Sequence, residues 1–223
     1  MRLAGLPLVA ACVVMTACGD APREKPPVRT DSVVARTIPG PSAAPVRSPD
    51  TYRVRFETSK GPFVVEVKRE LAPRGSDRLY ELVTVGYFTD VRFFRIVPGF
   101  IVQFGMHGDP AVHKQWDAAT IPDDPIRSRN TRGTVAFAAS GPNSRATQLF
   151  ISTGDNRAKL DRQRLFSPFG TVVEGMDVVE KLYSDYGEEP NHARIARLGN
   201  AYLASWYPNL DYIKSATVLD ATP

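Results

Sequence analysis

Cysteine is scarce in this sequence: the 223 residues include only Cys12 and Cys18, both near the amino terminus. Beyond residue 18 the chain therefore has no cysteine for a disulfide, for a nucleophile or for a thiolate metal site. Histidine is scarce as well, with three residues, and none stands at the spacing of an HExxH zinc motif. We therefore expect no metal site.

Other short motifs of catalysis are missing too. The chain has no GxGxxG turn after a strand, no P-loop and no GxSxG nucleophile elbow. Asp123 and Asp124 are adjacent, but such a pair is more typical of a turn or a helix start than of an acid–base dyad. These absences remove the common nucleotide-binding and nucleophile motifs from the candidates.

Excess positive charge is concentrated before the predicted folded part. The formal net charge is +4, and residues 21–49 carry five basic side chains against two acidic ones. The remainder is close to neutral, whereas a nucleic-acid-binding domain carries its basic patch on the folded surface. We therefore expect no nucleic acid as a partner.

The first 17 residues are typical of a secretory signal. A basic start, Met1-Arg2, precedes the apolar run LAGLPLVAACVVM, which is too short to span a bilayer. The run ends in MTAC-GD, where the small pair Thr16-Ala17 before Cys18 resembles a bacterial lipobox. The resemblance implies cleavage before Cys18 and lipidation of that cysteine. An ordinary cleaved signal with a chance cysteine is the alternative.

Residues 18–49 are predicted to be the lipidated cysteine followed by a flexible tether. The segment is rich in Pro, Ser, Ala and Arg and has no apolar period, so it buries too little surface to offset its ordering entropy. We therefore expect an extracytoplasmic, lipid-anchored protein. Gly19 after the cysteine favours the periplasmic side of the outer membrane if the cell has two membranes.

From residue 50 to residue 223 the pattern is that of one folded, mainly β domain. Tyr52, Val54 and Phe56 alternate with polar residues, and the turn SKG leads into PFVVEVK, which predicts a hairpin over residues 52–68. Further strands are predicted in VRFFRIV, FIVQF, GTVAFAAS, TQLFISTG, FGTVVEG and DYIKSATVLD. About eight hairpin-linked strands favour an antiparallel barrel, since closure removes exposed edges.

Helices are predicted between these strands. Leu79, Leu82 and Val83 have helical spacing in APRGSDRLYELVTVGYF, and MDVVEKLYSDY predicts a second helix. The segment ARIARLGNAYLASWY predicts a third helix that is broken or capped at Gly199. Residues 106–132 are predicted to be a long loop.

An arginine and a glutamine interrupt the apolar stretch FFRIVPGFIVQFG, residues 93–105. An unpaired buried charge is costly, so Arg95 needs either a carboxylate partner or a water-facing cleft. Its guanidinium has five fixed donors, and Gln103 adds one acceptor and two donors. A site with these groups and several phenyl rings, but without nucleophile, acid or metal, indicates catalysis in which no bond is made.

Three blocks, in this order, resemble the cyclophilin-type peptidyl-prolyl isomerases: FFRIVPGFIVQFG, GTVAFAASGPNSRATQLFIS and LDRQRLFSPFGTVVEGMDVVEKL. The resemblance covers about residues 51–185 and the closing strand near 212–219. It implies an eight-stranded antiparallel barrel capped by two helices. Residues 186–211 exceed that core and are expected to form an extra helical insertion before the closing strand.

The resemblance also implies site residues. It makes Arg95 the catalytic residue and places Phe100, Phe150 and Leu160 around the prolyl ring. The full set of substrate-binding residues that it implies is Phe100, Gln103, Phe137, Ala138, Ala139, Gln148, Phe150, Leu160 and Phe166.

This sequence departs from the family pattern at a few positions. Lys159 stands where many eukaryotic members have a tryptophan that helps to bind cyclosporin, so inhibition by that drug is in doubt. Phe166 falls closest to a pocket histidine of many members, and Ala139 stands where asparagine is common. The apolar wall is kept, while polar groups are lost.

The resemblance implies an isomerase that needs no cofactor and acts on proline-containing polypeptides, helping extracytoplasmic proteins to fold. The lipid would tie it to the membrane, and a monomer is expected. Two alternatives stay open: a catalytically weak module on the same fold that binds proline peptides or scaffolds a complex, and a structural envelope lipoprotein without a ligand.

Overall fold

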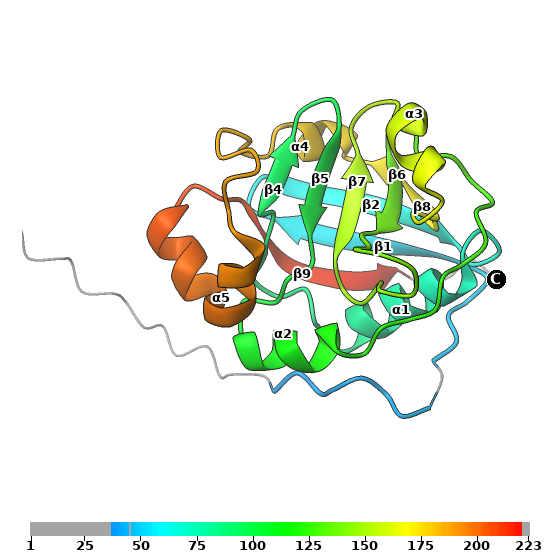
Figure 1. Cartoon of the computed structure of the whole chain (residues 1–223), viewed down its shortest axis with the longest axis horizontal. Coiled ribbons are helices and arrows are strands. Elements are labelled where there is room, and N and C mark those ends of the chain that lie inside the picture. Colours follow the sequence, from blue (N-terminus) through cyan, green and yellow to red (C-terminus); the bar gives the residue numbers. More distant parts are fainter. Residues whose placement is uncertain (1–36, 45, 220–223) are drawn as a thin grey trace, which may run out of the picture. The chain divides into compact units, whose positions relative to one another are not determined.

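The computed structural model describes residues 37–44 and 46–219 (Figure 1). The predicted signal, Cys18 and the first part of the predicted tether therefore lie outside the described residues. None of the described helices has both the length and the apolar character needed to cross a membrane.

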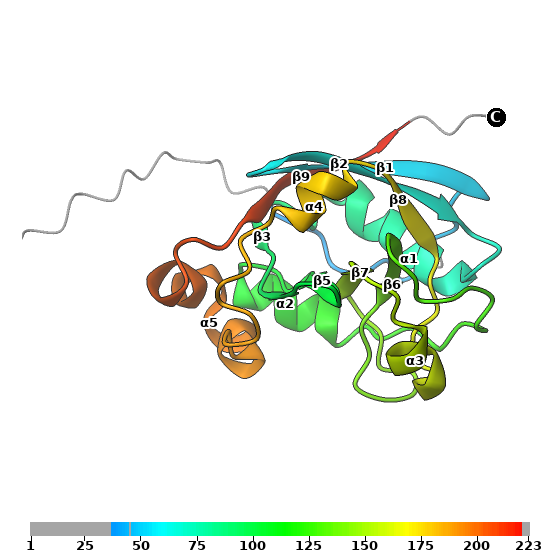
Figure 2. The same cartoon turned by 90° about the horizontal axis from the view of Figure 1, so that it is seen from above.

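The described strands form one curled antiparallel sheet of nine strands, in the order β3-β9-β1-β2-β8-β6-β7-β5-β4. The half that contains β1, β2 and β9 faces the half that contains β5, β6 and β7 (Figures 1 and 2). The strands are β1 (Thr51–Thr58), β2 (Gly61–Lys68), β3 (Val91–Arg92), β4 (Arg95–Val97), β5 (Ile101–Phe104), β6 (Thr134–Phe137), β7 (Leu149–Ser152), β8 (Gly170–Glu174) and β9 (Tyr212–Leu219).

The predicted fold class is confirmed, with one more strand than expected. The run VRFFRIV, predicted as one strand, is split into β3 and β4, which lie at opposite edges of the sheet. Phe93 and Phe94 carry the chain from one edge to the other. The first and last strands pair as expected, because β1 lies between β2 and β9.

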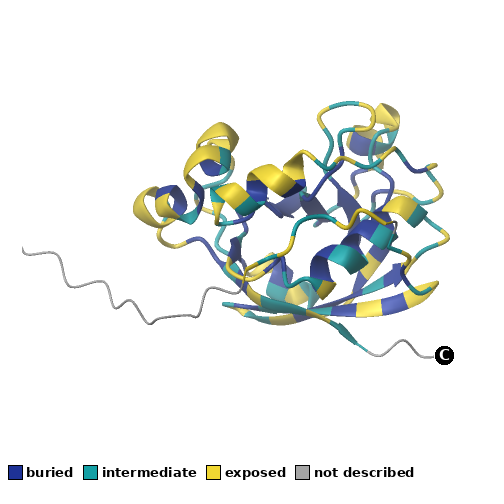
Figure 3. Cartoon of the chain, turned by 90° about the horizontal axis from the view of Figure 1, so that it is seen from below, coloured by how far each residue is buried: buried dark blue, intermediate teal, exposed yellow. Residues whose placement is uncertain are grey.

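Alternation explains the long hairpin. Val54 and Phe56 of β1 are buried, while Arg53 and Arg55 point outward, so one face of the strand meets the core (Figure 3). The Phe56 ring stacks on Phe63 of β2 with centroids 4.9 Å apart. Phe56 also meets the edge of Phe104 from the facing half of the sheet, at 6.0 Å. Both halves thus contribute to one core.

The helices lie at the open sides of the sheet. As predicted, α1 buries Leu79, Leu82 and Val83. The prediction of a long loop over residues 106–132 was wrong for its first part, because α2 lies there. This helix has Asp109 as its N-cap and a proline at its first position. The helices are α1 (Pro73–Thr84), α2 (Pro110–Asp117), α3 (Arg157–Leu160), α4 (Met176–Glu180) and α5 (His192–Trp206), with a 3-10 turn at Asp161–Gln163.

The expected insertion contains α5 and packs on the sheet through its own apolar cluster. This cluster joins Phe94 and Met106 to Ile195, Leu203 and Leu210. The predicted break at Gly199 is present, with φ of 57° inside the helix. A β-carbon there would lie 1.9 Å from the Gly108 carbonyl oxygen, so glycine is required both by the backbone angle and by the close approach.

Residues 37–44 and 46–50, here called the N-terminal arm, lie against the domain. Pro39 accepts a hydrogen bond from the indole Nε1 of the fully buried Trp116 at 3.0 Å. Ser42 donates its amide to Glu81 at 2.7 Å, and the Ser48 amide donates to Asp77 at 2.9 Å. The predicted tether therefore does not extend to residue 49, because its described part is docked on α1 and α2.

Candidate active site

The register of four strands brings the predicted polar and apolar site residues into one row. Arg95 of β4 lies opposite Gln103 of β5, Gln103 lies opposite Phe150 of β7, and Phe150 lies opposite Ala136 of β6. Directly opposed residues point to the same face of a sheet. This face is the outer one, away from the main core.

Polar side chains along this row form a chain of hydrogen bonds. Arg95 Nη1 donates to Gln103 Oε1 at 3.1 Å, and Gln103 Nε2 donates to Gln148 Oε1 at 3.0 Å. A guanidinium has no acceptor, so it must meet the amide oxygen of Gln103 and thereby sets the direction of the chain. The Gln148 amide nitrogen and the remaining guanidinium N–H groups are left to donate to a peptide.

A small apolar cluster, separate from the main core, lies beside the guanidinium and is here called the aromatic pocket. Its buried floor consists of Ile101, Ala136, Phe150 and Leu160. Phe100, Ala138 and Phe166 pack around it and are partly exposed. The rings of Phe150 and Phe166 meet edge to face at 5.6 Å.

Two cations lie over the Phe100 ring at the rim of this pocket. The Arg95 guanidinium carbon is 5.8 Å from the ring centroid and the Lys159 ammonium is 4.9 Å from it. This rim is therefore cationic at Lys159, the position where the resemblance predicts a tryptophan in many eukaryotic members.

Asn156 fixes the pocket walls relative to each other, a role that no local sequence pattern indicates. Its side-chain amide donates to the Phe100 carbonyl at 2.8 Å, and its backbone carbonyl accepts from the Leu160 amide at 2.8 Å. Asn156 is 2% exposed. It therefore joins the β4–β5 turn to the short helix α3.

Phe137 does not belong to the pocket, which corrects the sequence-based expectation. Its side chain is fully buried in the main core, where its ring lies 5.4 Å from that of Phe169. Successive residues of a strand point to opposite faces, so the neighbouring Ala136 faces the pocket instead. Ile101 joins the pocket by the same alternation, because it shares a face with Gln103.

A polar cavity of about 400 Å³ adjoins the row beyond Gln103 and Gln148. Ala138 and Ala139 form part of its wall, and His192 reaches it from the insertion. The His192 ring packs against the edge of Phe94 at 5.0 Å. Burial, and secondarily the positive charge of Arg95, lower the pKa of His192, so this side chain is neutral at pH 7.

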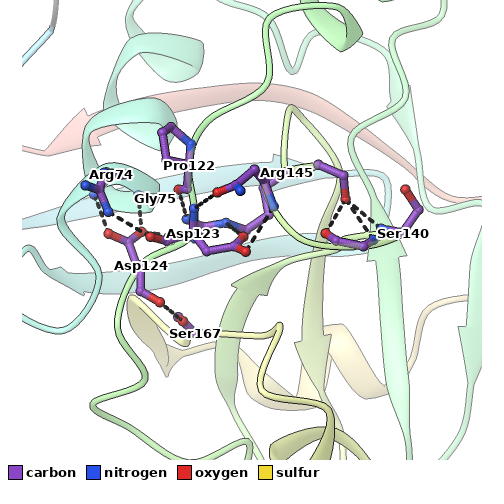
Figure 4. A network of polar contacts seen from close by, with 11 residues as sticks. Arg74, Gly75, Pro122, Asp123, Asp124, Ser140, Arg145 and Ser167 are labelled. Atoms are coloured by element: carbon purple, nitrogen blue, oxygen red, sulfur yellow. Dashed lines mark hydrogen bonds and ion pairs between the residues drawn. The ribbon is translucent and has the colours of Figure 1, made fainter.

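A buried ion network holds the loop that forms this cavity wall (Figure 4). Arg145 is 1% exposed and donates to Asp124 Oδ2 at 3.0 Å and to the Pro122 carbonyl. Asp124 also accepts the amides of Arg74 and Gly75, both at 2.9 Å, at the start of α1. Asp123 and Asp124 are thus structural, and Asp124 serves a helix start about 50 residues earlier in the chain.

The residues that the structure describes offer no metal centre. Among them, no three or more His, Cys, Asp or Glu side chains gather closely enough to hold an ion. Two histidines of the predicted loop are buried instead: His107 Nδ1 accepts the Asp109 amide at 3.0 Å, and His113 is 2% exposed on α2.

Comparison with known proteins gives consistent relatives. A family model described as "Cyclophilin type peptidyl-prolyl cis-trans isomerase/CLD" matches residues 53–200. The Arabidopsis thaliana protein named peptidyl-prolyl cis-trans isomerase CYP18-2 is 34% identical over 160 residues, which cover 68% of this chain and 93% of that protein. An Acinetobacter baylyi peptidyl-prolyl cis-trans isomerase is 31% identical over 147 residues, covering 62% and 77%.

Solved structures agree at the level of the fold. A crystal structure of a Cryptosporidium parvum cyclophilin type peptidyl-prolyl cis-trans isomerase superposes with a TM-score of 0.56 at 19% identity, covering 77% of this chain and 99% of that one. A second structure of that protein, in the presence of the dipeptide ala-pro, has a TM-score of 0.55 and 20% identity.

Proposed function

This chain belongs to the cyclophilin-type peptidyl-prolyl cis-trans isomerase family, and we propose that it accelerates rotation about X–Pro bonds with Arg95 as its catalytic residue. One observation carries the assignment: the strand register sets Arg95 and Gln103 in one row with the buried floor of an aromatic pocket, Phe150. A cation and a hydrogen-bonding amide are thus held beside a site of suitable chemistry for a prolyl ring.

The chemistry requires no bond to be made. Resonance gives the X–Pro bond a rotational barrier of about 18–20 kcal/mol, and uncatalysed rotation takes tens to hundreds of seconds. In the twisted transition state the proline nitrogen becomes pyramidal and gains a lone pair. A donor aimed at that nitrogen stabilises the twisted form more than the planar form, which is the requirement for catalysis.

Each part of the site has a role in this scheme. The pocket of Phe100, Phe150, Leu160 and Phe166 grips the prolyl ring, and a free N–H of Arg95 meets the developing lone pair. Because the guanidinium is already oriented by Gln103, little reorganisation is needed at the moment of rotation. Gln148 and the backbone near Ala139 hold the peptide on the other side, so that one end of the bond turns while the other is fixed.

We also propose that the enzyme works outside the cytoplasm, anchored by lipid on Cys18. The support is the signal-like pattern of residues 1–17 and the cysteine at its end. Incorporation of labelled palmitate into the chain in a bacterial host, with Cys18→Ser as the control, tests the anchor. Label in both forms, or in neither, rules out lipidation at this residue.

The activity is tested with a proline tetrapeptide of the Ala-Pro-Phe type and the chain from Gly19 onward. We expect catalysed cis-to-trans isomerisation, and we expect Arg95→Ala to lower kcat/KM about a hundredfold, as for the loss of one preorganised donor. If both forms match the uncatalysed rate, the enzyme assignment fails. Titration of the same peptide by calorimetry then decides between the weak peptide-binding module and a protein without a ligand.

A further inference from the structure

The insertion places a carboxylate on the catalytic arginine. Glu188, in the segment between α4 and α5, accepts a hydrogen bond on Oε1 from Arg95 Nε at 2.7 Å and a second one from Nη2. The Arg95 side chain is 25% exposed and that of Glu188 is 61% exposed. The pair is therefore partly exposed, and water has access to the carboxylate.

The backbone around Glu188 is fixed to the sheet. The Gly187 carbonyl accepts the Ile96 amide of β4 at 3.1 Å, so the segment runs beside the outer edge of the strand that carries Arg95. The Gly187 amide donates to Ser184 at 2.9 Å, and the Glu189 amide donates to Tyr186 at 2.9 Å. Two successive turns thus present the Glu188 side chain to Arg95.

The insertion helix supports this segment from behind. Tyr207, just after α5, donates its hydroxyl to the Glu189 carbonyl at 3.2 Å, and its ring meets that of Tyr186 at 5.1 Å. Both tyrosines pack on the cluster built around Phe94, the residue before Arg95. The segments that carry the Glu188 carboxylate and the Arg95 guanidinium therefore pack on the same apolar cluster.

Some N–H groups of Arg95 bind neighbouring side chains, and others remain free to bind the substrate. A guanidinium has five N–H groups, one on Nε and two on each terminal nitrogen. Glu188 takes the Nε–H and one on Nη2, and Gln103 takes one on Nη1. One N–H on each terminal nitrogen remains for the substrate, so the carboxylate holds the side chain without occupying all of its donors.

We propose that Glu188 is a positioning residue for Arg95. The proposal rests on the proposed isomerase function and adds a specific role for the insertion. Without Glu188 the guanidinium keeps a single hydrogen bond to Gln103 and a contact with the Phe100 face. A long side chain held at one edge samples several rotamers, whereas acceptors on two sides, Glu188 and Gln103, fix the plane of the guanidinium beside the Phe100 ring.

The experiment compares Glu188→Ala and Glu188→Gln in the chain from Gly19 onward, with Glu189→Gln as the matched control on the same turn. We expect Glu188→Ala to lower kcat about threefold to tenfold and to leave the peptide Kd within about twofold, because the loss is one of orientation. Glu188→Gln retains an acceptor for the Arg95 Nε–H, so its kcat should be at least about half of the parent's. The thermal midpoint should not change, since exposed ion pairs contribute little to stability.

A double-mutant cycle and a second measurement distinguish failure of the positioning role of Glu188 from failure of the isomerase assignment. In the Arg95→Ala background, Glu188→Ala should have no further effect on kcat. Unchanged or increased kcat in Glu188→Ala alone overturns the positioning role, while an inactive parent overturns the isomerase assignment. The Arg95 Nε–H signal in the NMR spectrum reports on positioning without activity: it should exchange slowly with water in the parent and rapidly in Glu188→Ala, and equal exchange in both also overturns the role.

Discussion

Removal of the Asp124 side chain should cause a large loss in the free energy of unfolding, although few atoms are removed. It is 6% exposed and accepts three hydrogen bonds: from the amides of Arg74 and Gly75 and from the buried guanidinium of Arg145. The change Asp124→Ala leaves two amides at the start of α1 without their acceptor and leaves the Arg145 charge without its closest carboxylate. Both consequences can be given a magnitude.

Loss of an N-terminal cap typically costs about 1 kcal/mol. A buried charge that loses its partner costs about 3–5 kcal/mol. Arg145 retains the Pro122 carbonyl and a contact of 3.4 Å with Asp123, a side chain that is 30% exposed, so the lower end applies. We therefore expect Asp124→Ala to lower the free energy of unfolding by about 4 kcal/mol, a large part of the 5–15 kcal/mol that is usual for a domain.

Urea unfolding followed by tryptophan fluorescence measures this quantity, because Trp116 is buried in the folded state. With a denaturant slope of about 2 kcal/mol per molar, the midpoint should fall by about 2 M. Asp123→Ala is the matched control and should cost about 1 kcal/mol, since its carboxylate is partly in water. If Asp124→Ala destabilises no more than Asp123→Ala, the assignment of a buried network around Arg145 is wrong.

Three further predictions concern the site, the core and the response to acid. Arg95→Lys keeps the charge but loses the planar fork, so kcat/KM should fall about tenfold or more with little change in peptide Kd; full activity would contradict the donor geometry. Phe137→Leu should lower the free energy of unfolding by about 1 kcal/mol and leave KM unchanged, because the ring lies in the core; a raised KM would return it to the pocket. Burial lowers the pKa of His107, His113 and His192. Since the unfolded chain then takes up protons before the folded one, the urea midpoint should fall as the pH drops from about 6.5 toward the lowered pKa values, and a flat midpoint between pH 7.5 and 5.5 would refute this.

Of the residues predicted for the site, the structure brings together those that depend on a local sequence pattern. Arg95 and Gln103 stand out because charged and amide groups are rare in apolar strands, and alternation along β5 puts Ile101 on the same face as Gln103. Phe137 was misplaced because the family position was adopted without applying that alternation to β6. The same rule would have selected Ala136, which lies opposite Phe150.

Other features could not be read locally, because they depend on contacts between distant segments. Glu188 and His192 come from the insertion and reach the site only because α5 packs on Phe94. Asp124 caps a helix from a loop far along the chain, so the local sequence of α1 gives no sign of it. By contrast, Asp109-Pro110 is an ordinary helix-start signal, and attention to it would have found α2 in the predicted loop.

The docked N-terminal arm has a mechanical consequence if the proposed lipid on Cys18 holds the chain at a membrane. A force applied at the amino terminus acts on the arm before it acts on the sheet. The arm is joined to α1 and α2 by separate hydrogen bonds at Pro39, Ser42 and Ser48. Such bonds yield one after another. The next segment, β1, is paired with β2 from Thr51 and with β9 from Arg53, so it must slide against two neighbours together. Under a pulling force the arm can therefore detach and lengthen the link to the membrane while the domain that carries the site stays folded.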